Sequence, residues 1–491
     1  MSFISTRGGA CVTASQAILR GLAPDGGLYV PAVFPQMTLA DIAALTKLDY
    51  RARALTILRG YLDDFNAQEL ADAIASAYEA AKFDDAAIAP TKKLDSNTHV
   101  LELFHGPTLA FKDMALQLLP HLTTLSAKKN GENREVAILV ATSGDTGKAA
   151  LEGFKDVPGT SCTVFYPTDG VSDVQKLQMT TTGGENTHVI ALNGNFDDAQ
   201  SGVKALFSSA DFHQQVNARG KVLSSANSIT FGRLVPQIVY YFSAYADLLN
   251  AGAIALGDEV NFVVPTGNFG NILAGYYARS MGLPVKKLIC ASNANNVLTD
   301  FIRTGVYDKR RPLLKTTSPS MDILVSSNLE RLLYLLSGDT ALVSGLMNSL
   351  NREGVYTVPG ELLATIQKKF WAAYCDDAKA QEIMGRVYRD WGYLCDPHTA
   401  SGWAAAEEYV SQTGDNRPMV VLSTASPYKF PAAVLAAVGG DTSGSEFDQM
   451  ARLSAMTGVP IPKNLAGLQG KPERHTGVIN KEDMLDYVLH L

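Results

Sequence analysis

An alternation of short apolar runs with helical stretches begins near His99 and continues for most of the chain, and it is the strongest constraint on the fold. The runs are rich in β-forming residues and almost continuously hydrophobic, as strands are when a parallel sheet is covered on both faces. The expected strands are Val136–Ala141, Cys162–Tyr166, His188–Leu192, Asn261–Val264, Lys287–Ala291 and Met419–Leu422. The expected helices among them are Phe196–Phe207, Gly232–Leu249, Ile272–Met281 and Pro431–Val438. This order predicts an α/β fold with doubly wound parallel sheets.

The remaining segments indicate how the chain divides. From Leu39 to about Ala87 the pattern is helical and rich in alanine. A chain of this length predicts roughly three domains of ~150 residues each, or two large domains with an appendage. We expect an N-terminal helical segment at 1–95 packed on the body, an α/β domain at 96–250, and a second α/β domain with a C-terminal extension at 251–491. Further helices are expected at Glu330–Leu350 and Pro359–Asp377, and a long loop at Tyr307–Ser327.

Composition argues against several classes of partner and cofactor. The formal net charge of -7 gives no general attraction to nucleic acid or to anionic membranes. No apolar run approaches the ~20 residues of a membrane-spanning helix. Five scattered cysteines without CxxC spacing and eight histidines without an HExxH-type cluster predict no disulfide framework and no metal site. With an N-terminus that lacks a secretory pattern, these features favour a reducing, cytoplasmic setting.

The stretch LFHGPTLAFKDMALQ places one lysine in a distinctive position. The run Thr98–Phe104 predicts a strand, a Gly-Pro pair breaks it, and helical spacing begins at Asp113. Lys112 is therefore expected at the start of a helix, flanked by Phe111 and Met114. An amine in apolar surroundings loses proton affinity and can form a Schiff base with an aldehyde. The alternative is a lysine that extends from a helix start into solvent.

Three expected strands run directly into Gly/Ser/Thr/Asn-rich turns that open helices: Ala141–Gly147, Pro265–Asn271 and Leu422–Pro427. Ligands of open α/β sheets bind beyond the carboxyl ends of strands, where helix N-termini offer free N–H groups to anions. Each turn could also be a tight connection without a ligand. Neither a Walker motif nor GxGxxG is present. Three polar turns with one lysine suggest a cofactor that has an aldehyde, a phosphate and a ring, as pyridoxal 5′-phosphate has.

Five segments together carry a family resemblance: GLAPDGGLYVP, HGPTLAFKD, ATSGDTG, ANSITFGRLVPQ and PTGNFGN. In this order they resemble threonine synthases of the longer bacterial and fungal type, from Ser5 to about Lys429. The resemblance implies the fold type II pyridoxal-phosphate architecture, like that of the tryptophan synthase β subunit. It also implies conversion of O-phospho-L-homoserine and water to L-threonine and phosphate, with only small molecules as partners and a monomer or homodimer as the assembly.

The resemblance implies a set of cofactor-binding residues. Lys112 would be the Schiff-base lysine, and Asp145 would lie beside the ring hydroxyl. Thr424 would bind the pyridine nitrogen, where a hydroxyl does not force a charged pyridinium. The backbone N–H groups that cradle the cofactor phosphate would be those of Gly267, Asn268, Phe269, Gly270 and Asn271.

A second set would bind the substrate. Ser228 and Arg233 match positions that hold the substrate phosphate, with Asn268 assisting, and a guanidinium suits phosphate because it binds with two N–H groups. The alternative for Arg233 is a surface arginine on a helix. The loop that receives the substrate carboxylate would comprise Ser143, Gly144, Thr146 and Gly147.

Other possibilities stay open at this point. A phospho-lyase that releases 2-oxobutyrate would share nearly all of these motifs, and a non-catalytic relative would be a binding protein. DPHTASG and SPSMDI are also familial, yet His398 has no derived chemical role, and a packed or helix-capping histidine is the favoured interpretation.

Overall fold

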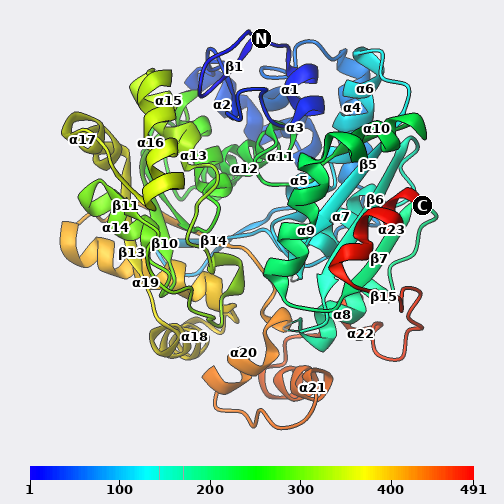
Figure 1. Cartoon of the computed structure of the whole chain (residues 1–491). Coiled ribbons are helices and arrows are strands. Elements are labelled where there is room, and N and C mark those ends of the chain that lie inside the picture. Colours follow the sequence, from blue (N-terminus) through cyan, green and yellow to red (C-terminus); the bar gives the residue numbers. More distant parts are fainter. Residues whose placement is uncertain (143, 170) are drawn as a thin grey trace.

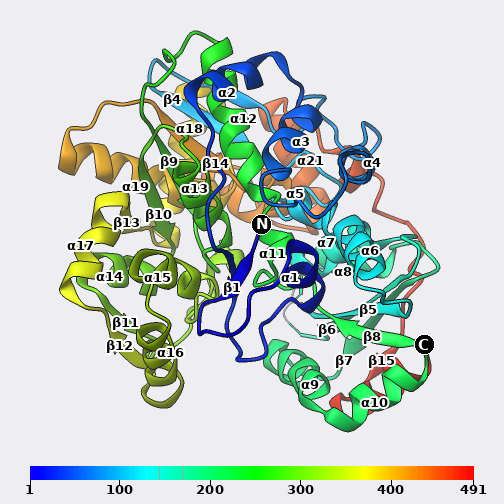
Figure 2. The same ribbon diagram turned by 90° about the horizontal axis from the view of Figure 1, so that it is seen from above.

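The computed structural model describes residues 1–142, 144–169 and 171–491. Two sheets lie side by side with helices packed around them, as Figure 1 shows. Seen from above in Figure 2, β1 (Phe3–Ser5) and α1 (Ala14–Arg20) lie between the two halves. The site described below also lies where these halves meet.

The larger sheet has six strands in the order β13-β10-β9-β14-β4-β3, and all neighbours pair parallel except β3 with β4. Its strands are β3 (Thr91–Lys93), β4 (Thr98–Glu102), β9 (Val260–Pro265), β10 (Val285–Ser292), β13 (Phe370–Tyr374) and β14 (Met419–Ser423). Alternate residues enter different cores because successive side chains point to opposite faces. Phe262 and Val420 pack towards α12 (Gln237–Asn250) and α13 (Gly270–Ser280). Val263 and Val421 pack towards α18 (Asp377–Trp391) and α19 (Pro397–Thr413).

The smaller sheet has five parallel strands in the order β15-β7-β6-β5-β8. They are β5 (Glu135–Ala141), β6 (Thr160–Pro167), β7 (Thr187–Leu192), β8 (Lys221–Ser224) and β15 (Val478–Ile479). Ile138 and Val164 pack towards α7 (Asp145–Phe154) on one face. The other face is covered by α9 (Phe196–Ser208), α10 (Ala210–Ala218) and α23 (Met484–Leu489).

Shorter elements connect these layers. β1 pairs with β2 (Tyr29–Pro31), and β11 (Val306–Asp308) pairs with β12 (Val355–Thr357), both antiparallel. The other helices are α2 (Leu39–Ala44), α3 (Tyr50–Leu58), α4 (Ala67–Ala77), α5 (Asp113–Leu116), α6 (Leu119–Lys129), α8 (Asp173–Thr180), α11 (Phe231–Leu234), α14 (Val297–Thr304), α15 (Leu329–Ser337), α16 (Thr340–Glu353), α17 (Gly360–Lys369), α20 (Pro431–Ala437), α21 (Glu446–Thr457) and α22 (Lys463–Ala466). The 3₁₀ turns are η1 (Leu45–Lys47), η2 (Pro319–Met321), η3 (Pro427–Lys429) and η4 (Lys481–Asp483).

The strands expected from the sequence are all confirmed, but three segments expected as helices are not single helices. The segment Glu330–Leu350 is divided into α15 and α16 at Gly338, which ends α15 with a left-handed backbone. The segment predicted as helix over Pro359–Asp377 is helical only to Lys369, because its β-forming aromatic residues continue into edge strand β13. The helix expected at Gly232–Leu249 is divided into α11 and α12 at Pro236, which has no N–H to continue the helical ladder. β8 was not predicted because it is short and only half-buried.

Strand pairing crosses the expected boundary at residues 250/251 in both directions. β4 lies within 96–250 but pairs with β14 in the larger sheet. β15 lies within 251–491 but pairs with β7 in the smaller sheet. The two sheets therefore do not coincide with the segments 96–250 and 251–491, and the division into 1–95, 96–250 and 251–491 stays a proposal. In the described part of the chain, no helix combines the length and the apolar character needed to cross a bilayer.

Candidate active site

Lys112 lies where the loop after β4 enters α5, as the sequence predicted. Its Nζ donates to Ser320 Oγ at 3.2 Å and lies 3.6 Å from Asp145 Oδ2. Burial lowers the pKa of Lys112, and the Asp145 carboxylate only partly opposes this. The nearby positive charges of Lys429 and Arg233 lower the pKa further, to about 8. An appreciable fraction of this amine is therefore uncharged and nucleophilic near neutral pH.

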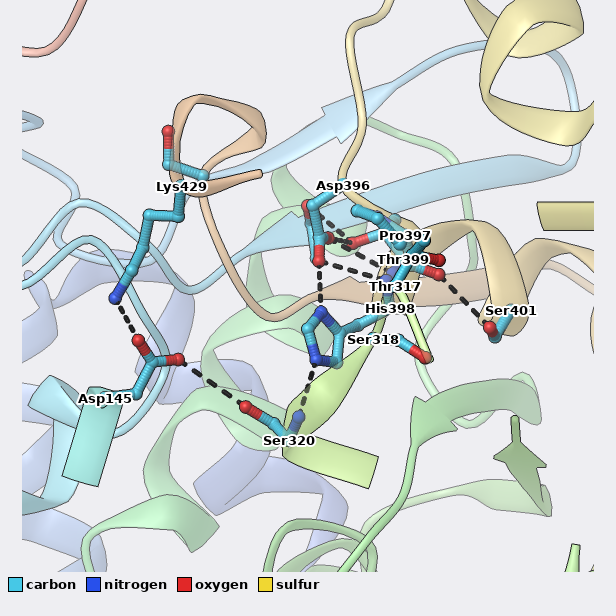
Figure 3. A network of polar contacts seen from close by, with 12 residues as sticks. Asp145, Thr317, Ser318, Ser320, Asp396, Pro397, His398, Thr399, Ser401 and Lys429 are labelled. Carbon is cyan, nitrogen blue, oxygen red and sulfur yellow. Dashed lines mark hydrogen bonds and ion pairs between the residues drawn. The ribbon is translucent and has the colours of Figure 1, made fainter. Parts of the chain in front are cut away.

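Asp145 is the first residue of α7, and its carboxylate forms a buried ion pair with Lys429 (Figure 3). Lys429 is the last residue of η3, which follows the turn after β14, and its Nζ also donates to the carbonyl oxygen of Thr108 at 2.9 Å. Burial alone would raise the pKa of Asp145, but the charges of Lys429 and Lys112 hold it well below its ordinary value. The carboxylate stays ionised, and it neutralises one of the two lysines.

The turn from β9 into α13 has the geometry of an anion site. Phe269 adopts a left-handed conformation with φ 62°, which is uncommon for a non-glycine residue. Among the described residues, no acceptor binds the amide N–H groups of residues 267–271. A β-carbon on Gly267 would lie 2.6 Å from the Ser320 carbonyl oxygen, whereas one on Gly270 would have ordinary space. Free N–H groups at the N-terminus of an eleven-residue helix can hold a phosphate.

Polar side chains fix this turn from behind. Ser326 Oγ donates to the Gly267 carbonyl at 2.7 Å, and Asn328 Nδ2 donates to the Asn268 carbonyl at 2.9 Å. Asn271 Oδ1 accepts from the hydroxyls of Tyr240 and Tyr241 at 2.7 and 2.8 Å. Asn271 Nδ2 is buried with no partner among the described residues. The turn is therefore rigid, and it retains unused donors.

Thr424 follows β14 on the same edge of the larger sheet. Its carbonyl oxygen accepts from the Phe111 amide at 2.8 Å, so the residue is tied to the one that precedes Lys112. The side chain is buried, and its hydroxyl has no hydrogen-bond partner in the part of the chain that the structure describes. It is available to a ligand.

The residues expected to receive the substrate carboxylate lie in the loop before α7 and in the first turn of that helix. Ser143 lies outside the described residues. The amides of Gly144 and Gly147 donate to Thr142 Oγ1 at 3.0 and 3.1 Å, so a hydroxyl of the protein already binds both. The Thr146 amide has no acceptor among the described residues. Among the described residues, Thr146 is thus the expected member whose amide stays available to a ligand.

Arg233 lies on α11 and is buried, so it is not a surface arginine. Its Nη1 donates to the Ala226 carbonyl at 2.7 Å, and no carboxylate pairs with it within the described ranges. Burial lowers the pKa of Arg233 to about 10. Ser228, on the loop before α11, lies 3.3 Å from Ser327 through their hydroxyl oxygens. A buried guanidinium without a carboxylate partner can bind an anionic ligand.

These groups fit pyridoxal 5′-phosphate. The amides of 267–271 and the Thr424 hydroxyl, which have no partner among the described residues, suit its phosphate and its ring nitrogen. The amine of Lys112, with its lowered pKa, suits its aldehyde. Arg233 is then left for a second anion, which a phosphorylated substrate would supply.

Four polar residues of the site were not assigned a role from the sequence: Lys429, Ser320, His398 and Asp396. SPSMDI and DPHTASG marked three of them as familial, but no spacing indicated that His398 and Ser320 would meet. Lys429 follows the LSTASP turn, but the sequence alone did not show that its side chain is buried in the site. Figure 3 shows how these residues are connected.

Comparison with known proteins identifies the class. The family model described as pyridoxal-phosphate dependent enzyme matches residues 89–425. The chain is thus a pyridoxal-phosphate-dependent enzyme of fold type II. Models described as threonine synthase N terminus and threonine synthase, C-terminal match residues 2–78 and 399–488. The chain belongs to the threonine synthase family.

Individual relatives agree with this assignment. Threonine synthase of Pseudomonas aeruginosa is 44% identical over 444 residues, with 88% of this chain and 90% of the relative covered. The structure of PLP-bound threonine synthase from Brucella melitensis matches with a TM-score of 0.89 and 40% identity, and covers 100% of this chain and 99% of its own. Human threonine synthase-like 1 is 41% identical over 90% of this chain, but the match spans only 61% of that longer protein.

Proposed function

We propose that this chain catalyses the reaction in which O-phospho-L-homoserine and water give L-threonine and phosphate. One observation carries the proposal: the buried amine of Lys112 shares its surroundings with two separate anion-binding features. One is the set of free amides at 267–271, and the other is the guanidinium of Arg233. A phosphorylated cofactor and a phosphorylated amino acid each need one such feature.

The cofactor contacts of this proposal follow from the donors described above. Residues 267–271 bind the cofactor phosphate through backbone N–H groups, and Thr424 binds the ring nitrogen. Asp145, kept ionised by Lys429, lies beside the ring hydroxyl. Lys112 holds the cofactor at its aldehyde carbon.

The substrate contacts use the remaining groups. Arg233 and Ser228 bind the substrate phosphate, with Asn268 assisting. The loop of Ser143, Gly144, Thr146 and Gly147 receives the carboxylate, and the free Thr146 amide is the first donor that we expect to act there.

Proton transfer falls to Lys112. When bound, pyridoxal phosphate withdraws electrons from the carbons near the substrate's amino group. The released amine of Lys112 takes the proton from the α-carbon and returns it at the end, and it moves protons at the β-carbon between these steps. Asp145 does not compete as a base because its pKa is held low. Phosphate leaves from the γ-carbon with its bridging oxygen, and water supplies the hydroxyl group at the β-carbon.

Product analysis in H₂¹⁸O tests the proposal. The purified protein is incubated with O-phospho-L-homoserine, and threonine, phosphate and 2-oxobutyrate are quantified. We expect threonine and phosphate in equal amounts, with the label in the threonine hydroxyl and none in the phosphate. Release of 2-oxobutyrate in place of threonine would identify a phospho-lyase, and the absence of any product would favour a binding protein.

Lys112→Ala is the matched control. It should make no product, and borohydride should no longer fix the cofactor to the chain. A cofactor label found on another lysine of the wild-type protein would contradict the assignment of Lys112.

The cellular location and the oligomeric state are also part of the proposal. A cytoplasmic location is supported by the cysteines, which are all free in the described structure. A monomer or homodimer is proposed as the assembly, and light scattering measures it directly.

A further inference from the structure

The hydroxyl of Ser320 is shared between Lys112 and Asp145. Lys112 Nζ donates to Ser320 Oγ at 3.2 Å, and Ser320 Oγ donates to Asp145 Oδ2 at 3.5 Å. A hydroxyl has one proton to donate and two lone pairs that accept. Because the ionised Asp145 takes the proton, Ser320 presents a lone pair to the amine. The amine is therefore held through one of its N–H groups.

His398 holds the backbone of Ser320 from the other side. The Ser320 amide N–H donates to His398 Nε2 at 3.1 Å. An amide nitrogen only donates, so the hydrogen-bond network assigns Nε2 as unprotonated and places the ring proton on Nδ1. Nδ1 then donates to Asp396 Oδ2 at 2.6 Å. Figure 3 shows this chain from Asp396 through His398 and Ser320 to Asp145.

Asp396 has little freedom to move. Its side chain is fully buried and caps α19, where it accepts from the amides of His398 and Thr399 at 3.0 and 3.1 Å. The His398 ring is itself buried and packs against Phe430 at a centroid distance of 5.0 Å. The N-terminus of α19 therefore fixes Asp396, and Asp396 in turn fixes the His398 ring that accepts from the Ser320 amide.

We propose that Ser320 orients the amine of Lys112, and that His398, held by Asp396, positions Ser320 for this task. This proposal rests on the proposed function in one respect: it takes the Lys112 amine to be the group that transfers protons in that reaction. Ser320 contacts the reacting nitrogen directly, whereas His398 acts through Ser320 and is a positioning residue. The same contacts also keep the Ser320 carbonyl against Gly267, which is why that position has no room for a β-carbon.

The test uses the full-length protein with two readouts. One is the rate at which the cofactor-free protein captures pyridoxal 5′-phosphate, followed by the visible absorption of the bound cofactor. The other is kcat and KM for O-phospho-L-homoserine. Ser320→Ala should slow capture and lower kcat by roughly tenfold, because the hydrogen bond that orients the Lys112 amine is lost. KM should change less than kcat, since Ser320 does not bind substrate.

His398 is tested with two variants. His398→Gln retains an acceptor for the Ser320 amide and should recover most of the wild-type rates, whereas His398→Leu should resemble Ser320→Ala. The double variant Ser320→Ala/His398→Leu should be no slower than its slower parent, because the two residues act in series. Ser401→Ala is the control, since this buried hydroxyl of α19 donates to the Pro397 carbonyl at 3.1 Å. It should leave both rates unchanged.

Three results would overturn the proposal. They are wild-type rates in Ser320→Ala, equal losses in His398→Gln and His398→Leu, and a double variant whose loss is the product of the single losses. A protein that captures cofactor normally but makes no threonine would contradict the proposed function instead. The capture rates would still decide the role of Ser320.

Discussion

Lys429 and Asp145 are separated by 284 residues in the sequence and form a buried ion pair beside Lys112. One carboxylate thus faces two lysines. Lys429 holds it closely, whereas Lys112 lies 3.6 Å away. Because Arg233 adds a further positive charge nearby, the site has more positive charge than this carboxylate can neutralise, and Lys112 is the lysine whose pKa falls to about 8.

The first prediction follows from this pKa. Only the uncharged amine attacks an aldehyde, so cofactor capture should accelerate as pH rises towards about 8 and level off above it, well below the ordinary lysine value of about 10.4. Lys429→Met removes a charge that lowers the pKa of Lys112, so the rise should move to higher pH. Stopped-flow absorbance measures the rate.

Lys148→Met is the control for this experiment. Lys148 is also a buried lysine, but it pairs with Glu152. Its removal should leave the pH profile in place. A wild-type rate that still climbs at about pH 10 would contradict the lowered pKa.

The second prediction concerns the phosphate turn. Gly270→Asp has space for its β-carbon, so its effect comes from a negative charge at an anion site. It should weaken cofactor affinity by at least about tenfold. Gly360→Asp is the matched control, since Gly360 is likewise the first residue of a helix and has open space around it. Equal cofactor affinity in both variants, measured by equilibrium titration, would place the phosphate elsewhere.

The third prediction separates substrate recognition from cofactor recognition. Arg233→Ala should keep its cofactor and its fold, yet lose about 2–5 kcal/mol of transition-state binding, or roughly 30- to 5,000-fold in kcat/KM. Arg233→Lys should recover only part, because an ammonium lacks the two-pronged contact. The exposed Arg20→Ala serves as the control. Full activity in Arg233→Ala would refute the assignment, and loss of cofactor would make Arg233 a cofactor or structural residue.

The fourth prediction concerns stability and pH. His105 Nδ1 lies 2.6 Å from Asp84 and Nε2 lies 2.9 Å from Glu102. Burial would lower the pKa of His105, but the two carboxylates outweigh it and raise the pKa to about 9. A histidine with a raised pKa contributes stability that is complete below about 6.5 and is lost as pH rises through about 9.

His105→Gln should therefore lower the free energy of unfolding, measured by urea titration, by an amount on the order of 2–3 kcal/mol at about pH 6. At about pH 10 the free energy of unfolding should change far less. His213→Gln is the comparison, because that ring contacts the carbonyl oxygen of Phe207 at 2.9 Å. An equal destabilisation of His105→Gln at both pH values would show that packing, and not charge, accounts for the loss.

Much of the fold was predictable because the buried parallel strands are continuous apolar runs. β5, β6, β7, β9, β10 and β14 were all found in this way. β13 was missed because an edge strand that follows a helix directly shows no break in apolar pattern. The pairing of β4 with β14 was beyond sequence reasoning, since periodicity identifies strands but does not identify their neighbours.

The site divides in a similar way. Lys112 and the turn at 267–271 have local signatures, namely a strand end, a helix start and glycines. Lys429, Ser320 and His398 act through contacts between distant segments, and nothing local predicts such contacts. Arg233 was suggested by resemblance, but its burial without a carboxylate partner emerges only from the packing around α11.

β14 lies between β4 and β9 in the larger sheet, yet the ribosome synthesises it long after both of these strands. While the ribosome is still synthesising the chain, β4 has no neighbour on that side, and the apolar strand that carries Lys112 towards the site lacks its support. Thr424 and Lys429 arrive with the same late segment. We therefore expect the proposed site to capture pyridoxal phosphate only after this segment has been synthesised, because an unfinished chain lacks Thr424 and Lys429.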